Sequence, residues 1–355
     1  MLFPEAEIWN GWPQNKNFDV KNRSDKPGAQ LLGKRQIDFL KEWAADWKNG
    51  IWMKAALSQT VFSTVATLPE DEMSDANVPK LRILKEGEYP PNDMPVSDFD
   101  SDGWPQTGRD LAVKQIRKGF ALHIAGDQHL GSTIQYGIDN FGDANFAFCV
   151  PAVSNVWPRR WYPKNPGENQ LPGQPKYTGD FEDGFGNKMT VYAVSNPVYT
   201  GLEPSRLYDR ATGYGIVKFH RNTRKITIEC WPRLSDPSQL DAQQYPGWPI
   251  TIEQIDNYNP SSFGYLPEIE ATGVTDPVIQ VINEANNEIV YTLRIKGNKF
   301  QPKAYFPGKY TVKIGEQGTD KVVTLNALAA AKDKQSSGKL TVQLDKETKD
   351  KEDVP

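Results

Sequence analysis

The chain has 355 residues, of which 38% are hydrophobic and 11% aromatic, enough to bury a sizeable core and to form two domains. Its formal net charge of -4 argues against nucleic-acid binding as a main role, since that role usually needs a concentrated basic face. The sequence has no run of about 18 apolar residues, so no transmembrane helix is expected, and residues 1–7 lack the basic and apolar regions of a signal peptide.

The N-terminal part of the chain predicts one helix and one strand between irregular segments. Residues 1–30 are rich in Pro, Asn, Lys and Asp and are expected to be irregular. Residues 34–48 place apolar side chains on one helical stripe and stop at an Asn-Gly pair, which predicts an amphipathic helix. A strand is predicted over 51–58. Residues 69–106 show little periodicity and are expected to form a long loop, a kind of segment that is often functional.

That loop contains Asp98, Asp100 and Asp102, followed by glycine, which is the spacing of the first half of an EF-hand calcium loop. The twelfth position is Arg109, where a bidentate Glu is required, and no helix is predicted before the loop. The favoured interpretation is a turn whose Asp side chains cap a helix over 109–118.

A candidate metal site follows the next predicted strand. Residues 120–125 have the period-2 pattern of a strand with neither face strongly polar, as in the middle of a covered sheet. Gly126 permits a sharp exit, so Asp127 and His129 stand at the tip of a rigid element. An Asp oxygen and a His nitrogen suit zinc, manganese or iron. Taken alone, Asp-x-His in a turn is more often a helix cap or a surface hydrogen-bond pair than a set of metal ligands, and the wider resemblance described below is what favours the metal site.

The other histidines and the cysteines predict no chemistry. His123 lies in mid-strand and is expected to be a satisfied core residue, whereas His220, at a hairpin turn, is expected to be exposed and non-catalytic. Cys149 and Cys230 could pair, but each lies in an apolar strand, so buried free thiols are favoured.

The loop over 157–163 is aromatic and basic, and two interpretations are open. Arg159 and Arg160 could give phosphate oxygens planar, permanently charged donors, with the loop's tryptophans walling a cleft. Alternatively, Arg stacked on Trp simply fixes a surface loop. The position of both arginines after the Asp-x-His pair favours the rim of a site.

The pattern changes after a linker near 257–264. Short alternating strands with turn signals at hairpin spacing predict an all-β, immunoglobulin-like or fibronectin-like sandwich over 266–330, with an extension to 345 left open. The tail from Ala331 is expected to be too charged to pack, and 346–355 to be a charged mobile end.

From Leu31 to about residue 265 the chain resembles the C-terminal half of the PhoD-like (alkaline phosphatase D) metallophosphoesterases. The match of Gly126–His129 to the family's GDxH metal motif is modestly specific, and an ordered series of further segments is much more so. These segments are Leu32–Leu40 with Trp43–Trp47, Met53–Thr60, Pro151-Ala152 with Trp157–Trp161, Gly213–Phe219 and Ile226–Arg233.

The resemblance implies an α/β fold over 31–265, part of a calcineurin-like metallophosphatase sandwich. It also implies a hydrolase of phosphate mono- or diesters that uses a metal-bound hydroxide. In such an enzyme His129 is a metal ligand, Asp127 is a ligand or orients one, and Arg159 or Arg160 contacts phosphate. The implied cofactors are divalent or trivalent ions of zinc, iron, manganese or calcium, and a periplasmic or secreted location is typical of the family. The phosphorylated substrate is not specified by the residues.

Members of this family assemble a two-metal centre largely from an N-terminal half, with ligands in DxH, GDxxD and GNHD motifs. Because the resemblance covers the C-terminal half alone, we expect those motifs to be absent, the metal site to be incomplete and the isolated chain to be inactive. An N-terminal half or an oligomeric partner is expected to complete it. The alternative is a non-catalytic binding or structural protein, in which a degenerate phosphatase domain and a β-sandwich attach to glycans or partner proteins.

Overall fold

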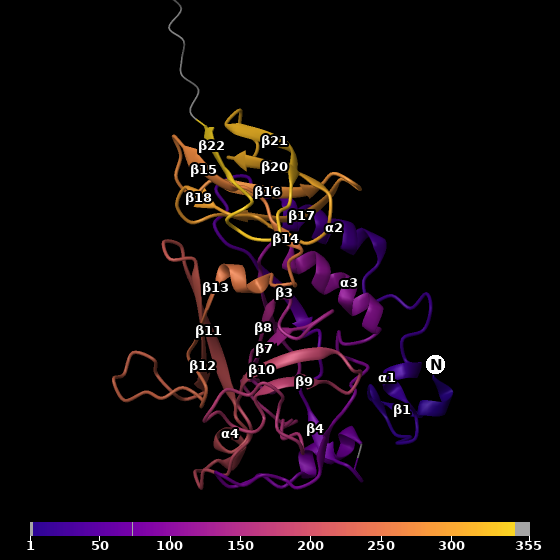
Figure 1. Ribbon diagram of the computed structural model, residues 1–355. Helices are drawn as coiled ribbons and strands as arrows, with labels where there is room; N and C mark the ends of the chain where they lie inside the picture. The colour runs from indigo at the N-terminus through magenta and orange to yellow at the C-terminus, as the bar shows by residue number, and fades with distance from the viewer. Residues whose placement is uncertain (1–2, 73, 345–355) are drawn as a thin grey trace, which may run out of the picture.

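The computed structural model describes residues 3–72 and 74–344, which form two parts, a larger one and a smaller β part built from residue 264 onward (Figure 1). Strands account for 32% and helices for 13% of the structure. A largely β protein is therefore the fold class that the structure establishes.

The larger part is organised around a six-stranded sheet with the order β3-β6-β8-β7-β10-β9. The first three of these strands are parallel and the others antiparallel. The interior position predicted for the strand over 120–125 is confirmed, because β6 pairs with β3 on one side and with β8 on the other. The strands are β3 (Ala55–Thr60), β6 (Leu122–Gly126), β7 (Ser132–Tyr136), β8 (Phe146–Cys149), β9 (Gly179–Glu182) and β10 (Lys188–Val194).

The two faces of this sheet are covered differently. Helices α2 (Lys34–Ala45) and α3 (Gln106–Arg117) pack on one face, and a small antiparallel sheet packs on the other. That small sheet is formed by β11 (Gly213–His220), β12 (Lys225–Pro232) and β13 (Ile250–Glu253). Each face thus has its own apolar core, as expected for a sheet whose strands are apolar on both sides.

The start of α3 differs from the sequence-based expectation. The helix begins at Gln106, and its N-cap is Pro105, which makes no side-chain cap hydrogen bond. The expected capping by Asp98–Asp102 is therefore wrong. The Oδ1 atom of Asp98 instead accepts from the backbone N–H of Asp100 at 3.0 Å, which closes a local turn well before the helix.

Residues 264–343 form short strands around one shared core. A four-stranded sheet has the order β17-β16-β20-β21, a three-stranded sheet has the order β18-β15-β22, and β14 pairs with β19. The strands are β14 (Gly264–Tyr265), β15 (Glu268–Thr272), β16 (Val278–Asn283), β17 (Glu288–Arg294), β18 (Lys299–Phe300), β19 (Lys303–Ala304), β20 (Lys309–Gly315), β21 (Val322–Ala329) and β22 (Lys339–Gln343).

Strand β22 corrects the expectation that the chain beyond Ala331 is too charged to pack. It pairs in parallel with β15, and Val342 and Leu344 are buried in the core. The alternation of apolar and polar residues along this strand outweighs its charge, because the charged side chains point to solvent. The expected mobile end over 346–355 lies outside the described residues.

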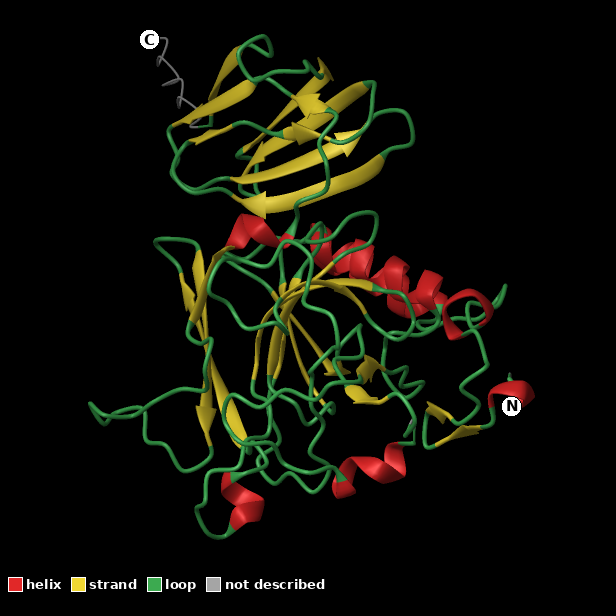
Figure 2. Ribbon diagram, turned by 60° about the horizontal axis from the view of Figure 1, so that its bottom comes forward, coloured by secondary structure: helices red, strands yellow, loops and turns green. Residues whose placement is uncertain are grey.

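The smaller part rests on the helical side of the larger one, with α2 against β17 (Figure 2). Trp47 and Phe120 belong to the larger part, but their side chains pack in the core of the smaller one. Arg294 of β17 donates from Nε to the carbonyl oxygen of Ile51 at 2.7 Å and forms a bidentate ion pair with Glu316 at 2.8 and 2.9 Å. The bond from Arg294 to Ile51, together with Trp47 and Phe120 in the core of the smaller part, joins the two parts, whereas the pair with Glu316 orients Arg294 within the smaller part.

The N-terminal segment is more ordered than expected for an irregular loop. Its elements pack on the loop around Phe99 and Trp104, where Phe3 and Phe18 form a small aromatic core. These elements are η1 (Pro4–Ala6), β1 (Ile8–Trp9), β2 (Trp12–Pro13) and α1 (Val20–Arg23). The remaining short elements are β4 (Thr67–Pro69), η2 (Asp75–Lys80), β5 (Asp93–Pro95), α4 (Ser205–Tyr208) and η3 (Gln254–Asn257). Across the described part of the chain, no helix combines the length and apolar character needed to cross a bilayer.

Candidate functional site

The loop directly after β6 presents the two residues predicted to bind metal. Asp127 and His129 both have a left-handed backbone, with φ of 66° and 60°, a conformation that is uncommon for residues other than glycine. Gln128 between them is fully buried and donates from Nε2 to Oγ1 of Thr60 at 3.2 Å. The buried Gln128 anchors the loop, so Asp127 is exposed and His129 is half-buried beyond the strand end.

The ring of His129 is oriented by the neighbouring aromatic loop. Its Nδ1 lies 3.3 Å from the carbonyl oxygen of Trp157, whose Nε1 donates to Oδ1 of Asp75 at 2.6 Å. Among the residues that the structure describes, the Nε2 atom of His129 has no hydrogen-bond partner. An imidazole held through one nitrogen and free at the other is the usual state of a metal-binding histidine.

Arg159 lies beside this loop, as predicted. Its Nη1 donates to Oε1 of Gln128 at 3.0 Å, and its Nη2 forms an ion pair with Oδ2 of Asp98 at 2.7 Å. Its guanidinium also stacks 5.3 Å from the ring centre of Trp12. The N-terminal segment therefore packs against the site, a contact that the sequence did not predict.

Arg160 is placed differently from Arg159. Its guanidinium is buried and binds Asp93 through two hydrogen bonds, from Nε at 2.7 Å and from Nη2 at 2.8 Å. Bidentate pairing of this kind uses the donors that would otherwise meet a phosphate. Arg160 thus fixes β5, and we retain Arg159 alone as a rim candidate.

Several carboxylates gather around the loop and make it acidic. Burial, followed by repulsion from Asp127, raises the pKa of Asp102 to about 6. Burial is also the main cause that raises the pKa of Asp100, with repulsion from Asp98 and Asp127 adding to it. The pKa of Asp75 is raised by burial although Trp157 donates to it. Mutual repulsion of this kind favours a cation in the site over an anion.

The donors present do not complete a metal site. Within residues 3–72 and 74–344, no three His, Cys, Asp or Glu side chains come close enough together to hold a metal ion. Asp127 and His129 supply two donors, whereas zinc, the metal with the fewest ligands among those implied, takes four. Asp98 of the EF-hand-like string is committed to Arg159, which agrees with the interpretation that this string is no calcium loop.

Besides the DxH string that Asp127–His129 itself forms, a second motif that was expected to be absent is present as a string of letters. Gly179–Asp183 reads GDxxD, one of the N-terminal ligand patterns of the family. Asp183 is fully buried and accepts hydrogen bonds from the backbone N–H groups of Thr64, Phe185 and Asn187 at 2.9 Å each. Such a carboxylate organises loops, so the string supplies no metal ligand next to Asp127 and His129.

The expectation for His123 is confirmed. The residue is 1% exposed, with Nε2 2.8 Å from Oγ of Ser58 and Nδ1 2.8 Å from the hydroxyl of Tyr136. Burial lowers the pKa of His123 to about 3, so the ring is neutral. His220 is exposed, as predicted. Both cysteines are free and buried, and burial raises the pKa of the Cys149 thiol to about 12.

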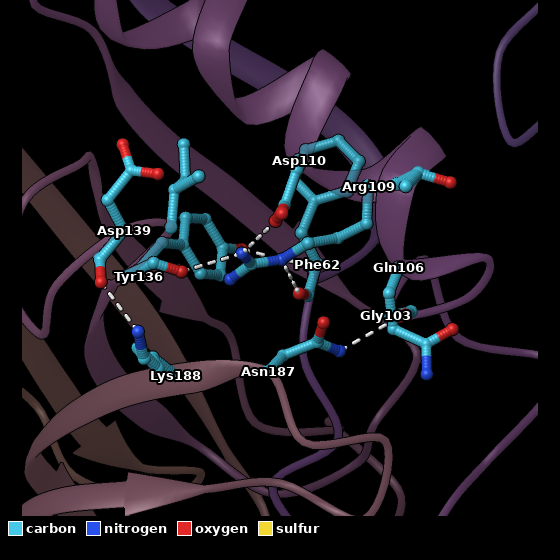
Figure 3. Close-up of polar contacts among 12 residues, drawn as sticks. Phe62, Gly103, Gln106, Arg109, Asp110, Tyr136, Asp139, Asn187 and Lys188 are labelled. Atoms are coloured by element: carbon cyan, nitrogen blue, oxygen red, sulfur yellow. Dashed lines mark hydrogen bonds and ion pairs between the residues drawn. The ribbon is translucent and has the colours of Figure 1, made fainter. Parts of the chain in front are cut away.

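Arg109 of α3 ties the segment after β3 to the turn after β7 (Figure 3). Its buried guanidinium donates from Nε to the carbonyl oxygen of Phe62 at 2.9 Å and from Nη1 to that of Gly137 at 2.7 Å. The hydroxyl of Tyr136, whose ring lies under this guanidinium, accepts from the N–H of Phe62 and contacts His123. These contacts fix the segment after β3, which borders the candidate site.

The chain has no significant match among protein-family models, curated proteins or solved structures.

Proposed function

We propose that residues 31–265 belong to a PhoD-like metallophosphoesterase, which hydrolyses phosphate mono- or diesters once further ligands join Asp127 and His129. The observation that carries this proposal is the loop after β6, where two non-glycine residues in left-handed conformation present a carboxylate and an imidazole at the carboxyl end of a sheet strand. Backbone strain of this kind persists only where the surrounding structure enforces it, and it collects at functional sites.

An open sheet edge next to this loop supports completion by another polypeptide segment. In the described part of the chain, no strand pairs with the outer edge of β3, and Leu57 on this strand is 76% exposed. Thr60 at the end of β3 is in register with Gly126 of β6. A strand added to this edge would therefore end beside Asp127 and could bring in the missing donors. Unpaired edges of this kind are templates for strand addition.

The second sheet offers a similar edge. Strand β11 is the outermost strand of its sheet, and its Phe219 is 38% exposed. Ile124 of β6 and Val217 of β11 are only partly buried in the core between the two sheets. We propose that the two sheets form one half of a calcineurin-like sandwich and that residues 266–330, extended by β22, form an immunoglobulin-like module.

The proposal is tested with the chain alone and with the chain joined to the polypeptide encoded immediately upstream. Metal content after purification and turnover of p-nitrophenyl phosphate and bis-p-nitrophenyl phosphate are measured with zinc, iron, manganese and calcium. We expect no retained metal and negligible turnover for the chain alone, because two donors leave most coordination positions to water. We expect both properties in the joined protein.

His129→Ala and His220→Ala form a matched pair for this test, because each removes one imidazole and only the first touches the site. Turnover of the joined protein should be lost in His129→Ala and kept in His220→Ala. Robust turnover of the chain alone that His129→Ala abolishes would show that no second segment is needed. A joined protein without turnover would refute the phosphoesterase proposal.

A second candidate is a non-catalytic binding or structural protein. It is favoured by the pairing of Arg159 with buried Asp98, which neutralises the cation that would otherwise meet a phosphate. The acidic surroundings of Asp127 would also repel a phosphate that arrived without a metal. This candidate is preferred if the joined protein binds metal but turns over neither ester.

A further inference from the structure

A pocket of about 520 Å³ lies at the other end of the central sheet from Asp127. It is formed by β7, β9 and β10, by the loop that carries Leu171, and by the segment from Gly247 to Asn259. In the register of β7 and β8, Gln135, which lines the pocket, lies opposite Phe146, whereas Ser132 at the other end of β7 lies opposite Cys149. Cys149 is next to Ala125, near the carboxyl end of β6 that leads to Asp127. The pocket is therefore separate from the candidate metal site, and its volume is in the usual range for small-molecule sites.

The charge of the lining excludes phosphate as its ligand. No described Lys, Arg or His lines the pocket, and Asp180 is its one charged side chain among those described. Oδ1 of Asp180 accepts from Oγ1 of Thr190, and Oδ2 accepts from Nδ2 of Asn169 at 2.8 Å. An anion placed beside this carboxylate would be repelled without a compensating cation.

The polar groups of the wall are held in fixed orientations. Tyr192 donates from its hydroxyl to Oε1 of Gln135 at 3.1 Å. Gln135 in turn donates from Nε2 to two carbonyl oxygens, of Ala144 at 3.0 Å and of Asp256 at 2.9 Å. The ring of Tyr192 packs against Phe146 at 5.0 Å between centres. The hydroxyl, amide and carboxylate oxygens keep lone pairs for a ligand, and their positions are set before it binds.

Apolar surface accompanies this polar array. Phe141 and Ile250 line the pocket, and Leu171 at its wall is 65% exposed. We propose that the pocket binds a neutral saccharide of one or two units. Such a ligand carries hydroxyl groups for the fixed oxygens and amides, and C–H faces for the aromatic and aliphatic side chains. This inference is independent of the proposed phosphoesterase activity, since it uses none of the same residues.

The test uses saturation-transfer NMR on the full chain with methyl α-D-glucopyranoside, methyl β-D-galactopyranoside and N-acetylglucosamine as probes. We expect transfer to at least one of them. Asn259→Trp should reduce it by about tenfold, because this exposed residue lines the pocket and an indole would fill the space. Leu171→Ser is a second pocket variant, in case the first fails to fold. Both should melt as the unaltered chain does.

The controls are Asn222→Trp, which places the same indole on an exposed hairpin turn, and His129→Ala, which alters the candidate metal site. Neither should change the transfer. Methyl phosphate, whose methyl protons can receive saturation, and choline serve as an anionic and a cationic probe. The inference is overturned if no saccharide receives saturation, if both pocket variants bind like the unaltered chain, or if choline or methyl phosphate alone gives a signal that these variants abolish.

Discussion

The buried imidazole of His123 should make this protein sensitive to mild acid. The ring is enclosed between Ser58 and Tyr136, stacks on Phe62 at 4.8 Å between centres, and is 1% exposed. Burial lowers the pKa of His123 to about 3 in the folded protein, whereas an unfolded histidine has a pKa of about 6.5. Between these two values the unfolded chain binds a proton that the folded chain does not bind.

The sign and size of the effect follow from this difference. Since the folded pKa is lowered, the contribution of His123 to stability is complete above pH 6.5 and is lost as the pH falls towards 3. Each pH unit in that window costs about 1.4 kcal/mol for one proton. At pH 5, one and a half units below the unfolded value, the free energy of unfolding should be lower by about 2 kcal/mol from this residue alone.

Urea unfolding of the unaltered chain and of His123→Gln at pH 7.5 and pH 5 measures this contribution. The amide cannot titrate, so the difference in unfolding free energy between the two proteins should change by about 2 kcal/mol between the two pH values. Carboxylates common to both proteins cancel in that difference. Ser58→Ala is the control, because it removes a neighbour of the ring but keeps the titrating group. If the difference is the same at both pH values, His123 is not the neutral buried base that its surroundings indicate.

Four further predictions concern other parts of the molecule. Because the pKa of Asp102 is raised to about 6, this carboxylate destabilises the fold as the pH rises through that value. Asp102→Asn should therefore stabilise the chain at pH 7 by on the order of 1 kcal/mol, a figure discounted for the partial exposure of the side chain. Thermal melts near pH 4 should show no gain in stability. Leu57→Lys should reduce self-association of the chain in analytical ultracentrifugation, because a lysine at the open edge of β3 disfavours pairing with another strand. Leu240→Lys, at a fully exposed loop position, is the control and should leave association unchanged. Equal association of both variants would contradict the role of this edge. Arg294→Ala should cost about 2 kcal/mol and separate the melting of the two parts in calorimetry, and a single unchanged transition would count against this residue as their connection. Arg160→Lys should lower the free energy of unfolding by about 1–2 kcal/mol, because lysine cannot bind Asp93 through two hydrogen bonds. If the variant instead loses catalysis in the joined protein and keeps its stability, Arg160 contacts the substrate phosphate at the rim of the site.

Local patterns in the sequence predicted several elements correctly. The amphipathic stripe over 34–48 corresponds to α2, and the alternation over 120–125 corresponds to β6 in the sheet interior. The apolar flanks of Cys149 and Cys230 predicted buried free thiols, and the structure has both. These predictions succeed because burial and short-range periodicity depend on residues that are close together in the sequence.

Contacts between distant segments were not predictable in the same way. The packing of Trp12 on Arg159 brings together residues that are far apart in the chain, and no local sequence pattern predicts it. The pairing of Arg160 with Asp93 was likewise not predictable from neighbouring residues. As a result, two adjacent arginines with identical chemistry have different surroundings, since Arg159 pairs with Asp98. The charge of the tail beyond Ala331 predicts an unpacked end, whereas its pairing with β15 depends on a strand edge that only the folded chain provides.

The sequence by itself determined the short strands of the part after residue 264, the rigid strand that ends at Gly126, and the placement of a carboxylate and an imidazole two residues apart beyond it. Tertiary structure alone decided which donors, cations and carboxylates surround that pair. It also decided that the described residues leave β3 with an open edge and give Asp127 and His129 no third candidate ligand. The physical reason is that a strand requires only the period of its own side chains, whereas a site requires side chains from several segments to meet at distances of a few ångströms.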